Sequence, residues 1–228
     1  MRPEQLVVVC GTGTEVGKTW VSCALLGELR RRGHSVAARK PAQSFDLDAE
    51  GARLGGSTDA ERLGAASGEP PDYVCPTWRS YHLAMAPPMA AQALGLPAFT
   101  VADLVDELAW PDDQVTLGLV ETAGGVRSPQ ADDGDAVDLV AALEPDLVVL
   151  VADAGLGTIN AVRLSLTALG GWAGAREPVV VLDRFDARHD LHRRNREWLR
   201  DRDGSRVLVF PGDERALADF VLGSCSGG

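Results

Sequence analysis

The sequence predicts an α/β fold in which one doubly wound, mostly parallel sheet is flanked by helices. Predicted strands and helices alternate along most of the 228 residues, an order typical of parallel strands joined by crossover helices. The strands are continuous Val/Leu runs rather than alternating patterns, which indicates burial on both faces. The length suits one large domain and is short for two, so we expect a single domain over 1–228, with a disordered tail at 223–228.

The first predicted strand, at 6–10, leads into a Gly-rich turn, GTGTEVGKT at 11–19, and then into a helix predicted over 18–32. A strand that stops at such a turn and continues as a helix presents several backbone N–H groups at one point, with the positive end of the helix dipole behind them. Lys18 adds an ammonium group, and Thr19 adds a hydroxyl that can ligate Mg²⁺. We therefore expect the turn to bind a nucleoside triphosphate. The predicted nucleotide-binding residues of the turn are Gly13, Thr14, Glu15, Val16, Gly17, Lys18 and Thr19.

The turn departs at one position from the usual P-loop pattern, G-x-x-x-x-G-K-[ST]. The pattern places its first glycine at position 12, which is Thr12 here, whereas the glycines are Gly11 and Gly13. A Gly-rich turn with an incidental GKT is the alternative. The strand before it and the helix after it favour a P-loop, and hence a P-loop NTPase-like fold.

The remaining elements continue the alternation. Strands are expected at 35–39, 115–121, 147–152, 178–183 and 206–210. Helices are expected at 57–67, 89–94, 101–109, 136–143, 159–169, 191–200 and 213–222, the first opened by a cap in STDAE. The polar segment 41–58 is interpreted as an active-site loop, and residues 69–82 and 126–135 are expected to be irregular.

Polar residues follow several of the predicted strands. Lys40 comes after the second strand, Glu121 ends the third, and Asp183 ends the fifth, while 153–160 follow the fourth. In doubly wound sheets ligands bind beyond the carboxyl ends of the strands. We therefore expect these residues to lie beside the turn at 11–19.

Composition limits the partners and the compartment. A net charge of −11 argues against nucleic acid or an anionic membrane as the main partner, and no window approaches transmembrane length. The four cysteines, at positions 10, 23, 75 and 225, share no metal-ligand spacing. We interpret them as reduced thiols in a cytoplasmic protein.

Lysine occurs only at Lys18 and Lys40, while the other 20 basic residues are arginine. A compact ammonium differs from a planar guanidinium in fit and in proton affinity. Codon bias is the alternative, but one lysine lies in the predicted P-loop and the other follows the next strand. This placement favours a functional role for both.

Five motifs, in this order, resemble those of the dethiobiotin synthetase family. They are GTGTEVGKT, KPAQS with Lys40 and Ser44, STDA with Asp59, ETAGG with Glu121, and LGTIN at 156–160. The resemblance extends from residue 6 to about 213 and includes the threonine at position 12. It implies an ATP- and Mg²⁺-dependent reaction of biotin biosynthesis in which 7,8-diaminononanoate and CO₂ give dethiobiotin, ADP and phosphate. The route implied is a carbamate, then a carbamic–phosphoric anhydride, then closure of a ureido ring.

The resemblance also implies residue roles. The catalytic residues would be Lys18, on the β- and γ-phosphates, and Lys40, between carbamate and γ-phosphate. Mg²⁺ would be held by Thr19, Asp59 and Glu121, with Glu15 reached through water. The nucleotide base would contact Asp183, Pro211, Gly212 and Asp213. Substrate would be bound by Thr14, Lys40, Ser44, Gly124, Leu156, Gly157 and Asn160, the last three acting from the other subunit of a homodimer whose site lies at the interface.

Three positions depart from the family pattern. Thr122 replaces a glycine and should strain or crowd the site if that glycine serves a positive φ or a close approach to the substrate. Phe45 adds bulk beside Ser44. Asp183 replaces an adenine-binding asparagine, and since a carboxylate only accepts hydrogen bonds, we expect relaxed or altered nucleotide preference, with other NTPs, GTP among them, accepted.

Three other functions compete with this interpretation. One is an amidotransferase-like P-loop ligase, although no glutaminase part with a cysteine nucleophile is visible in the chain. Another is a nucleotide-dependent switch or partitioning ATPase, although the second lysine common in such loops is absent from TGTEV. The third is a paralogue that keeps the nucleotide site without turnover.

Overall fold

The structure is a computed structural model that describes residues 1–48, 50, 54, 56–170 and 177–223. Its centre is a six-stranded sheet with the order β10-β9-β8-β1-β5-β2, in which every neighbouring pair is parallel. The strands are β1 (Gln5–Gly11), β2 (Val36–Arg39), β5 (Leu117–Glu121), β8 (Leu147–Asp153), β9 (Val179–Asp183) and β10 (Val207–Val209). The predicted α/β fold class is confirmed.

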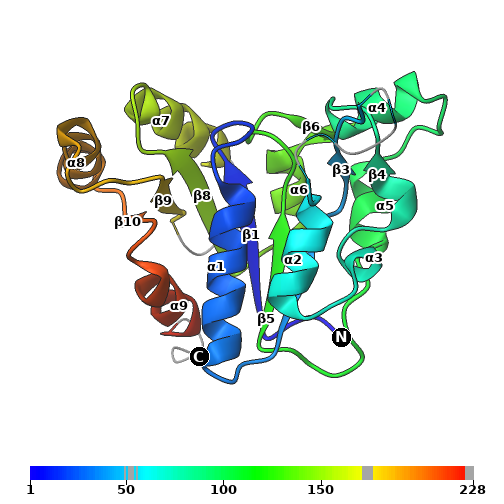
Figure 1. Cartoon of the computed structure of the whole chain (residues 1–228), viewed down its shortest axis with the longest axis horizontal. Coiled ribbons are helices and arrows are strands. Elements are labelled where there is room, and N and C mark those ends of the chain that lie inside the picture. The colour runs from blue at the N-terminus through cyan, green and yellow to red at the C-terminus, as the bar shows by residue number, and fades with distance from the viewer. Residues whose placement is uncertain (49, 51–53, 55, 171–176, 224–228) are drawn as a thin grey trace.

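Helices cover both faces of the sheet (Figure 1). The α-helices are α1 (Lys18–Arg31), α2 (Asp59–Ser67), α3 (Pro71–Val74), α4 (Pro87–Ala93), α5 (Val101–Asp106), α6 (Ala136–Leu143), α7 (Thr158–Leu169), α8 (Asp190–Glu197) and α9 (Glu214–Gly223). Helices α1, α2 and α9 pack on one face, and α5, α6 and α7 on the other. In the described part of the chain, no helix is long and apolar enough to cross a membrane.

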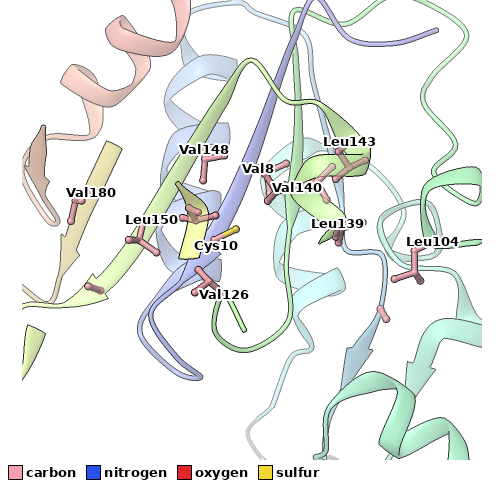
Figure 2. Packing of buried hydrophobic residues seen from close by; sticks show 14 of the residues in the cluster. Val8, Cys10, Leu104, Val126, Leu139, Val140, Leu143, Val148, Leu150 and Val180 are labelled. Carbon is pink, nitrogen blue, oxygen red and sulfur yellow. The ribbon is translucent and has the colours of Figure 1, made fainter. Parts of the chain in front are cut away.

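The continuous apolar strands follow from this double cover. Along β1, Val7 and Val9 pack with α1, whereas Val8 and Cys10 pack with α6 and α7 on the opposite face. Figure 2 shows Val8 and Cys10 among the aliphatic side chains of that second layer. Because every strand residue from Leu6 onward is buried, a polar alternation would place polar groups in a core.

Several short elements lie where the sequence predicted irregular chain. Residues 69–82 contain α3, the 3₁₀ turn η1 (Thr77–Arg79) and β4 (Ser80–Tyr81), which pairs with β3 (Gln43–Ser44). Residues 126–135 contain an antiparallel pair, β6 (Pro129–Ala131) and β7 (Gly134–Asp135). Elements of two to four residues are too short for a hydrophobic period to show.

Some element boundaries also differ from the prediction. The helix expected at 191–200 is α8, which ends at Glu197 and continues as the π-helix η2 (Trp198–Arg202). The predicted tail lies outside the described residues beyond Gly223, the last residue of α9, as do positions 49, 51–53 and 55 of the predicted active-site loop. The predicted cap of α2 is confirmed, because Thr58 and Glu61 form a capping box.

Candidate active site

A cleft of about 1130 Å³ opens at the carboxyl ends of the strands. The predicted site residues that line it are Thr14, Glu15, Gly17, Lys18, Thr19, Lys40, Ser44, Asp59, Gly124, Asp183 and Pro211. Lys18 and Lys40 therefore face the same cavity, as their positions after β1 and β2 predicted. Glu121 lies beneath it, fully buried, and reaches the cleft through the side chains it contacts.

The turn between β1 and α1 depends on two of its glycines. A Cβ on Gly11 would lie 2.9 Å from the Gly13 carbonyl oxygen. Gly17, the N-cap of α1, has a φ of +96°, and a Cβ there would collide with the Asp183 carboxylate. Gly13 has more room, with its nearest neighbour at 3.8 Å. The glycine that steric contact demands at the start of the turn is thus Gly11, and position 12 tolerates a threonine.

Lys18 crosses this turn. Its Nζ donates a hydrogen bond to the Gly13 carbonyl oxygen at 2.9 Å, and the side chain is buried. Burial and then the nearby Lys40 ammonium lower the pKa of Lys18 to about 8. An anion beside Lys18 would oppose both effects because it stabilises the charged ammonium, so the turn suits a negatively charged ligand.

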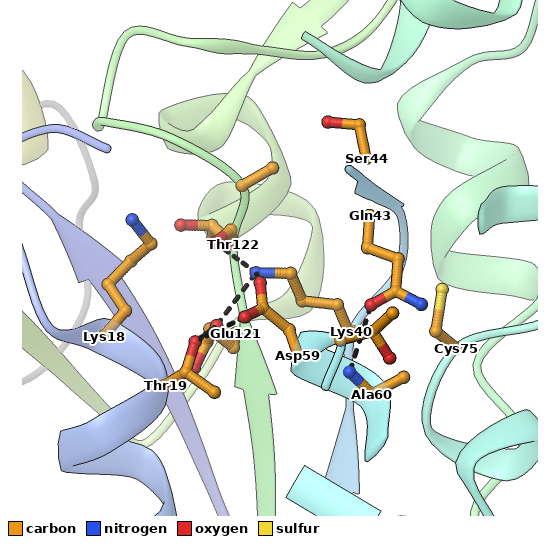
Figure 3. Close-up of polar contacts among 12 residues, drawn as sticks. Lys18, Thr19, Lys40, Gln43, Ser44, Asp59, Ala60, Cys75, Glu121 and Thr122 are labelled. Carbon is orange, nitrogen blue, oxygen red and sulfur yellow. Dashed lines mark hydrogen bonds and ion pairs between the residues drawn. The ribbon is translucent and has the colours of Figure 1, made fainter. Parts of the chain in front are cut away.

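A group of four polar side chains, from α1, α2, β5 and the residue after β2, lies beside the turn (Figure 3). The Lys40 Nζ lies 2.8 Å from Glu121 Oε1 and 2.9 Å from Asp59 Oδ2, and donates to the Thr122 carbonyl oxygen at 3.2 Å. The Thr19 hydroxyl lies 2.8 Å from Glu121 Oε1 and 2.9 Å from Asp59 Oδ1. One ammonium and one hydroxyl thus hold the same two carboxylates.

The two carboxylates of this group share one ammonium. Burial alone would lower the pKa of Lys40, but the Asp59 and Glu121 carboxylates outweigh it and hold the pKa above its ordinary value. Lys40 in turn lowers the pKa of Asp59 to about 2. Lys40 therefore stays charged over the whole physiological range, unlike a lysine buried without partners.

The outer rim of the cleft is formed by residues that follow β9 and β10. Asp183 is buried against Gly17, and burial raises the pKa of its carboxyl group. Pro211 lines the cleft. The predicted base contacts Gly212 and Asp213 do not line it. Instead, Asp213 accepts a hydrogen bond from the Val209 N–H at 2.9 Å and closes the turn before α9.

The turn after β5 accommodates the departures from the family pattern. Thr122 has no positive φ, is fully buried, and its hydroxyl donates to the Val9 carbonyl oxygen at 3.4 Å. The expected strain at Thr122 is therefore not found, and the positive φ of this turn, +64°, falls at Gly124.

Ser44 and Phe45 lie side by side in the lining of the cleft, as expected. The Ser44 hydroxyl donates to the Met85 carbonyl oxygen at 2.6 Å.

The segment predicted to act from a second subunit lies away from this cleft. Leu156 is 91% exposed, Gly157 is the N-cap of α7 with a φ of +92°, and Asn160 is exposed. Next to them, the buried Thr158 hydroxyl has no hydrogen-bond partner among the described residues. None of the three predicted substrate contacts lines the cleft of its own chain.

Two contributors were missed by the sequence interpretation. The Ser22 hydroxyl donates to Glu121 Oε2 at 2.7 Å. Its spacing of four from Lys18 could have placed it on the same face of α1. The Arg184 guanidinium donates to the Glu15 carbonyl oxygen at 2.6 Å, and no sequence pattern indicates this contact.

Comparisons with known proteins agree with the motifs. A family model described as an AAA domain matches residues 5–209. The chain is 37% identical over 221 residues to the ATP-dependent dethiobiotin synthetase BioD of Caulobacter sp. (strain K31), with 94% of this chain and 93% of that protein covered. The chain belongs to the dethiobiotin synthetase family. The synthetase of the same name from Haloferax mediterranei is 34% identical over 225 residues, covering 95% of this chain and 88% of its own length.

Solved structures of lower identity show the fold alone. Chloroplast FtsY from Physcomitrella patens gives a TM-score of 0.52 at 16% identity, covering 97% of this chain and 65% of that chain. Membership of the dethiobiotin synthetase family confirms the predicted ATP-dependent ligase class and decides against a switch ATPase.

The donor set of this synthetase fits a divalent cation. The Thr19 hydroxyl and the Asp59 and Glu121 carboxylates converge, and hard oxygen ligands of this kind suit Mg²⁺. Among the described residues, no three His, Cys, Asp or Glu side chains gather as a metal site by themselves. Two carboxylates and a hydroxyl leave the remaining coordination positions to water and phosphate, which is how Mg²⁺ is usually held beside a nucleotide.

Proposed function

We propose that this synthetase, a single-domain cytoplasmic homodimer, forms dethiobiotin from 7,8-diaminononanoate, CO₂ and ATP in the cleft beside β1, β2 and β5. The observation that carries the proposal is the placement of Lys40. Its ammonium lies within hydrogen-bond distance of two carboxylates in the same cavity as the P-loop lysine, Lys18. A reaction between two anions needs fixed positive charge at the point where they meet.

The turn at 13–19 would bind the triphosphate. Its backbone N–H groups and the start of α1 attract phosphate, and Lys18 would move from the Gly13 carbonyl to the β- and γ-phosphates. Thr19, Asp59 and Glu121 would hold Mg²⁺, with Glu15 reached through water. When bound, the ion supplies neutralisation of the phosphate oxygens.

Lys40 would hold the two reacting anions together. One amine of the diamine adds to CO₂ and loses a proton, which gives a carbamate. A carbamate oxygen then attacks the γ-phosphorus, and ADP leaves with the electrons of the broken P–O bond. The second amine attacks the carbonyl carbon of the mixed anhydride, phosphate leaves, and the amine loses its proton as the ureido ring closes. Lys40 suits the middle step because its charge is maintained and its ammonium has three N–H groups, which would turn toward the anions from Glu121, Asp59 and the Thr122 carbonyl.

The substrate would be held at both ends. Thr14, Ser44 and Gly124 line the cleft near Lys40 and would contact the diamine or carbamate. The distal carboxylate would bind the start of α7 in the second subunit of a homodimer, at Leu156, Gly157 and Asn160. The unpartnered Thr158 hydroxyl beside this helix start supports an anion there.

Phosphate release tests the proposal. The protein is assayed with Mg²⁺ and ATP, with and without bicarbonate and diaminononanoate, and phosphate release should require both.

Lys40→Ala should keep nucleotide binding while turnover falls on the order of a hundredfold, because a cation that acts at the transition state contributes roughly 3 kcal/mol. Normal turnover in Lys40→Ala would contradict the role of Lys40. Release that ignores the diamine would contradict the reaction, and nucleotide binding without any release would indicate a paralogue without turnover.

A further inference from the structure

Arg184 is the residue of the cleft rim to which the reaction above gives no role. It follows Asp183 at the end of β9, adopts a φ of +55° that is uncommon for a residue with a side chain, and lines the cleft. Its guanidinium extends from β9 across the end of β8 to the turn that follows β1. In the sheet, β8 lies between β9 and β1 (Figure 1). The hydrogen bonds of this one side chain therefore connect three neighbouring strand ends.

The first contact of Arg184 is with the P-loop backbone. Its Nη2 donates to the Glu15 carbonyl oxygen at 2.6 Å. Glu15 has a φ of +59°, which residues with a Cβ rarely adopt, so its conformation needs support from a neighbour. The Glu15–Val16 peptide is trans, and in a trans peptide the C=O and the N–H point in opposite directions. Holding the Glu15 carbonyl toward Arg184 therefore directs the Val16 N–H away from Arg184, into the turn.

The second contact fixes Arg184 itself. Its Nη1 donates to Asp153 Oδ2 at 2.9 Å, at the end of β8. The other carboxylate oxygen, Oδ1, accepts from the Gly155 N–H at 2.8 Å. Burial would raise the pKa of Asp153, but the Gly155 N–H and the Arg184 guanidinium outweigh it and lower the pKa. The carboxylate is thus a charged and oriented anchor for the guanidinium.

We propose that Arg184 is a positioning residue for nucleotide binding, which holds the Glu15–Val16 peptide with its N–H directed at a phosphate, and that Asp153 holds Arg184 in place. The inference rests on the proposed assignment of residues 13–19 to the nucleotide. Nη1 and Nη2 of Arg184 each donate one N–H group to a protein acceptor, and these two contacts together fix the position of the guanidinium.

Calorimetric titration with Mg²⁺–ATP and Mg²⁺–ADP tests the inference, on the wild type, Arg184→Met, Arg184→Lys, Asp153→Asn and the double variant Arg184→Met/Asp153→Asn. Arg184→Met should lower the affinity for both nucleotides by the same factor, on the order of tenfold, which is the usual effect of losing one charge-assisted hydrogen bond. Arg184→Lys keeps one donor for the Glu15 carbonyl and should recover part of the affinity. Asp153→Asn should give a smaller loss, and the double variant should bind no more weakly than Arg184→Met.

Arg163→Met is the matched control. Arg163 forms an exposed pair with Asp203 at 2.7 Å that does not line the cleft, so the affinity should not change. Thermal melting without nucleotide shows that each variant is folded. Unchanged affinity in Arg184→Met overturns the inference. So does tighter binding in Asp153→Asn, or a loss much larger for ATP than for ADP, because either indicates direct contact with the phosphates. Wild-type protein that binds neither nucleotide would overturn the proposed function together with the inference.

Discussion

At the inner end of the cleft charged groups share partners, whereas at the outer rim each group has a separate task. Glu121 accepts from Thr19, Ser22 and Lys40, and Lys40 also contacts Asp59. At the rim, Asp183 packs against Gly17, and its neighbour Arg184 contacts Asp153 and the Glu15 carbonyl. Removing one member of the inner group disturbs several shared contacts at once, while a change at the rim alters shape or a single hydrogen bond.

This difference separates chemistry from selectivity. The inner end is built from residues that match the family motifs, and it lies where the proposed reaction would bring anions together. The rim holds Asp183, the departure that is predicted to contact the nucleotide base. We therefore expect substitutions at the inner end to reduce turnover strongly, and those at the rim to change affinity or preference.

Glu121→Gln should have the largest effect. It removes one of the two carboxylate charges beside Lys40, which would also help to hold Mg²⁺, so phosphate release should fall at least a hundredfold. The free energy of unfolding should fall by about 2 kcal/mol, because Thr19, Ser22 and Lys40 lose a charged, fully buried acceptor while Asp59 still pairs with Lys40. Phosphate release and urea denaturation measure the two effects.

Glu28→Gln is the control for this substitution. Glu28 is a buried carboxylate on α1 that pairs with Arg31 and Arg32 and does not line the cleft. It should lower stability and leave phosphate release unchanged. Equal effects of Glu28→Gln and Glu121→Gln on release would mean that the inner group acts only through stability.

Gly17→Ala should have the next largest effect, at the point where the rim meets the P-loop. A residue with a methyl group is strained at a φ of +96°, and the methyl group would collide with the Asp183 carboxylate. The free energy of unfolding should therefore fall by about 2 kcal/mol. The affinity for ATP should fall tenfold or more, because the start of α1 must shift. Gly27 lies in the same helix, with nothing within contact of an added Cβ. Gly27→Ala should therefore raise the free energy of unfolding by roughly 0.5–1 kcal/mol and leave the affinity for ATP unchanged. Affinity that survives Gly17→Ala would show that the loop adapts freely.

Asp183→Asn should have the smallest effect and the most selective one. An amide both donates and accepts, so the preference for ATP over GTP should rise severalfold, as measured by turnover with each nucleotide. A drop in that preference would contradict the assignment of Asp183 to the base.

The difference in stability between the wild type and Asp183→Asn should depend on pH. Burial raises the pKa of Asp183 in the folded protein. The protonated Asp183 carboxyl group therefore contributes fully to the stability of the folded protein below the pKa of the unfolded chain, about 4. This contribution is lost as pH rises through the pKa of the folded protein. Asp183→Asn does not titrate, so it should be more stable than the wild type at pH 7, and the difference should vanish near pH 4. Urea denaturation at both pH values measures this, and a constant difference would contradict it.

The parallel sheet and the edge that carries the site were predictable, and many finer details were not. The strand runs placed Lys40 and Glu121 at the same edge of the sheet, and the structure joins them at 2.8 Å. The expected strain at Thr122 was wrong, because sequence does not reveal which residue of ETAGG takes the positive φ, and Gly124 does. The short pairs β3–β4 and β6–β7 were missed because two or three residues carry no period.

By itself, the sequence determined the alternation of strands and helices, the phosphate-binding turn and the family, because each depends on short runs of residues that are neighbours in the chain. Only the tertiary structure decided which distant groups touch. Lys40 meets Glu121 across 81 positions, and Arg184 meets Glu15 across 169. These contacts follow from the strand order β9-β8-β1-β5-β2, which is set by how the crossover helices pack on the sheet and leaves no period in the chain.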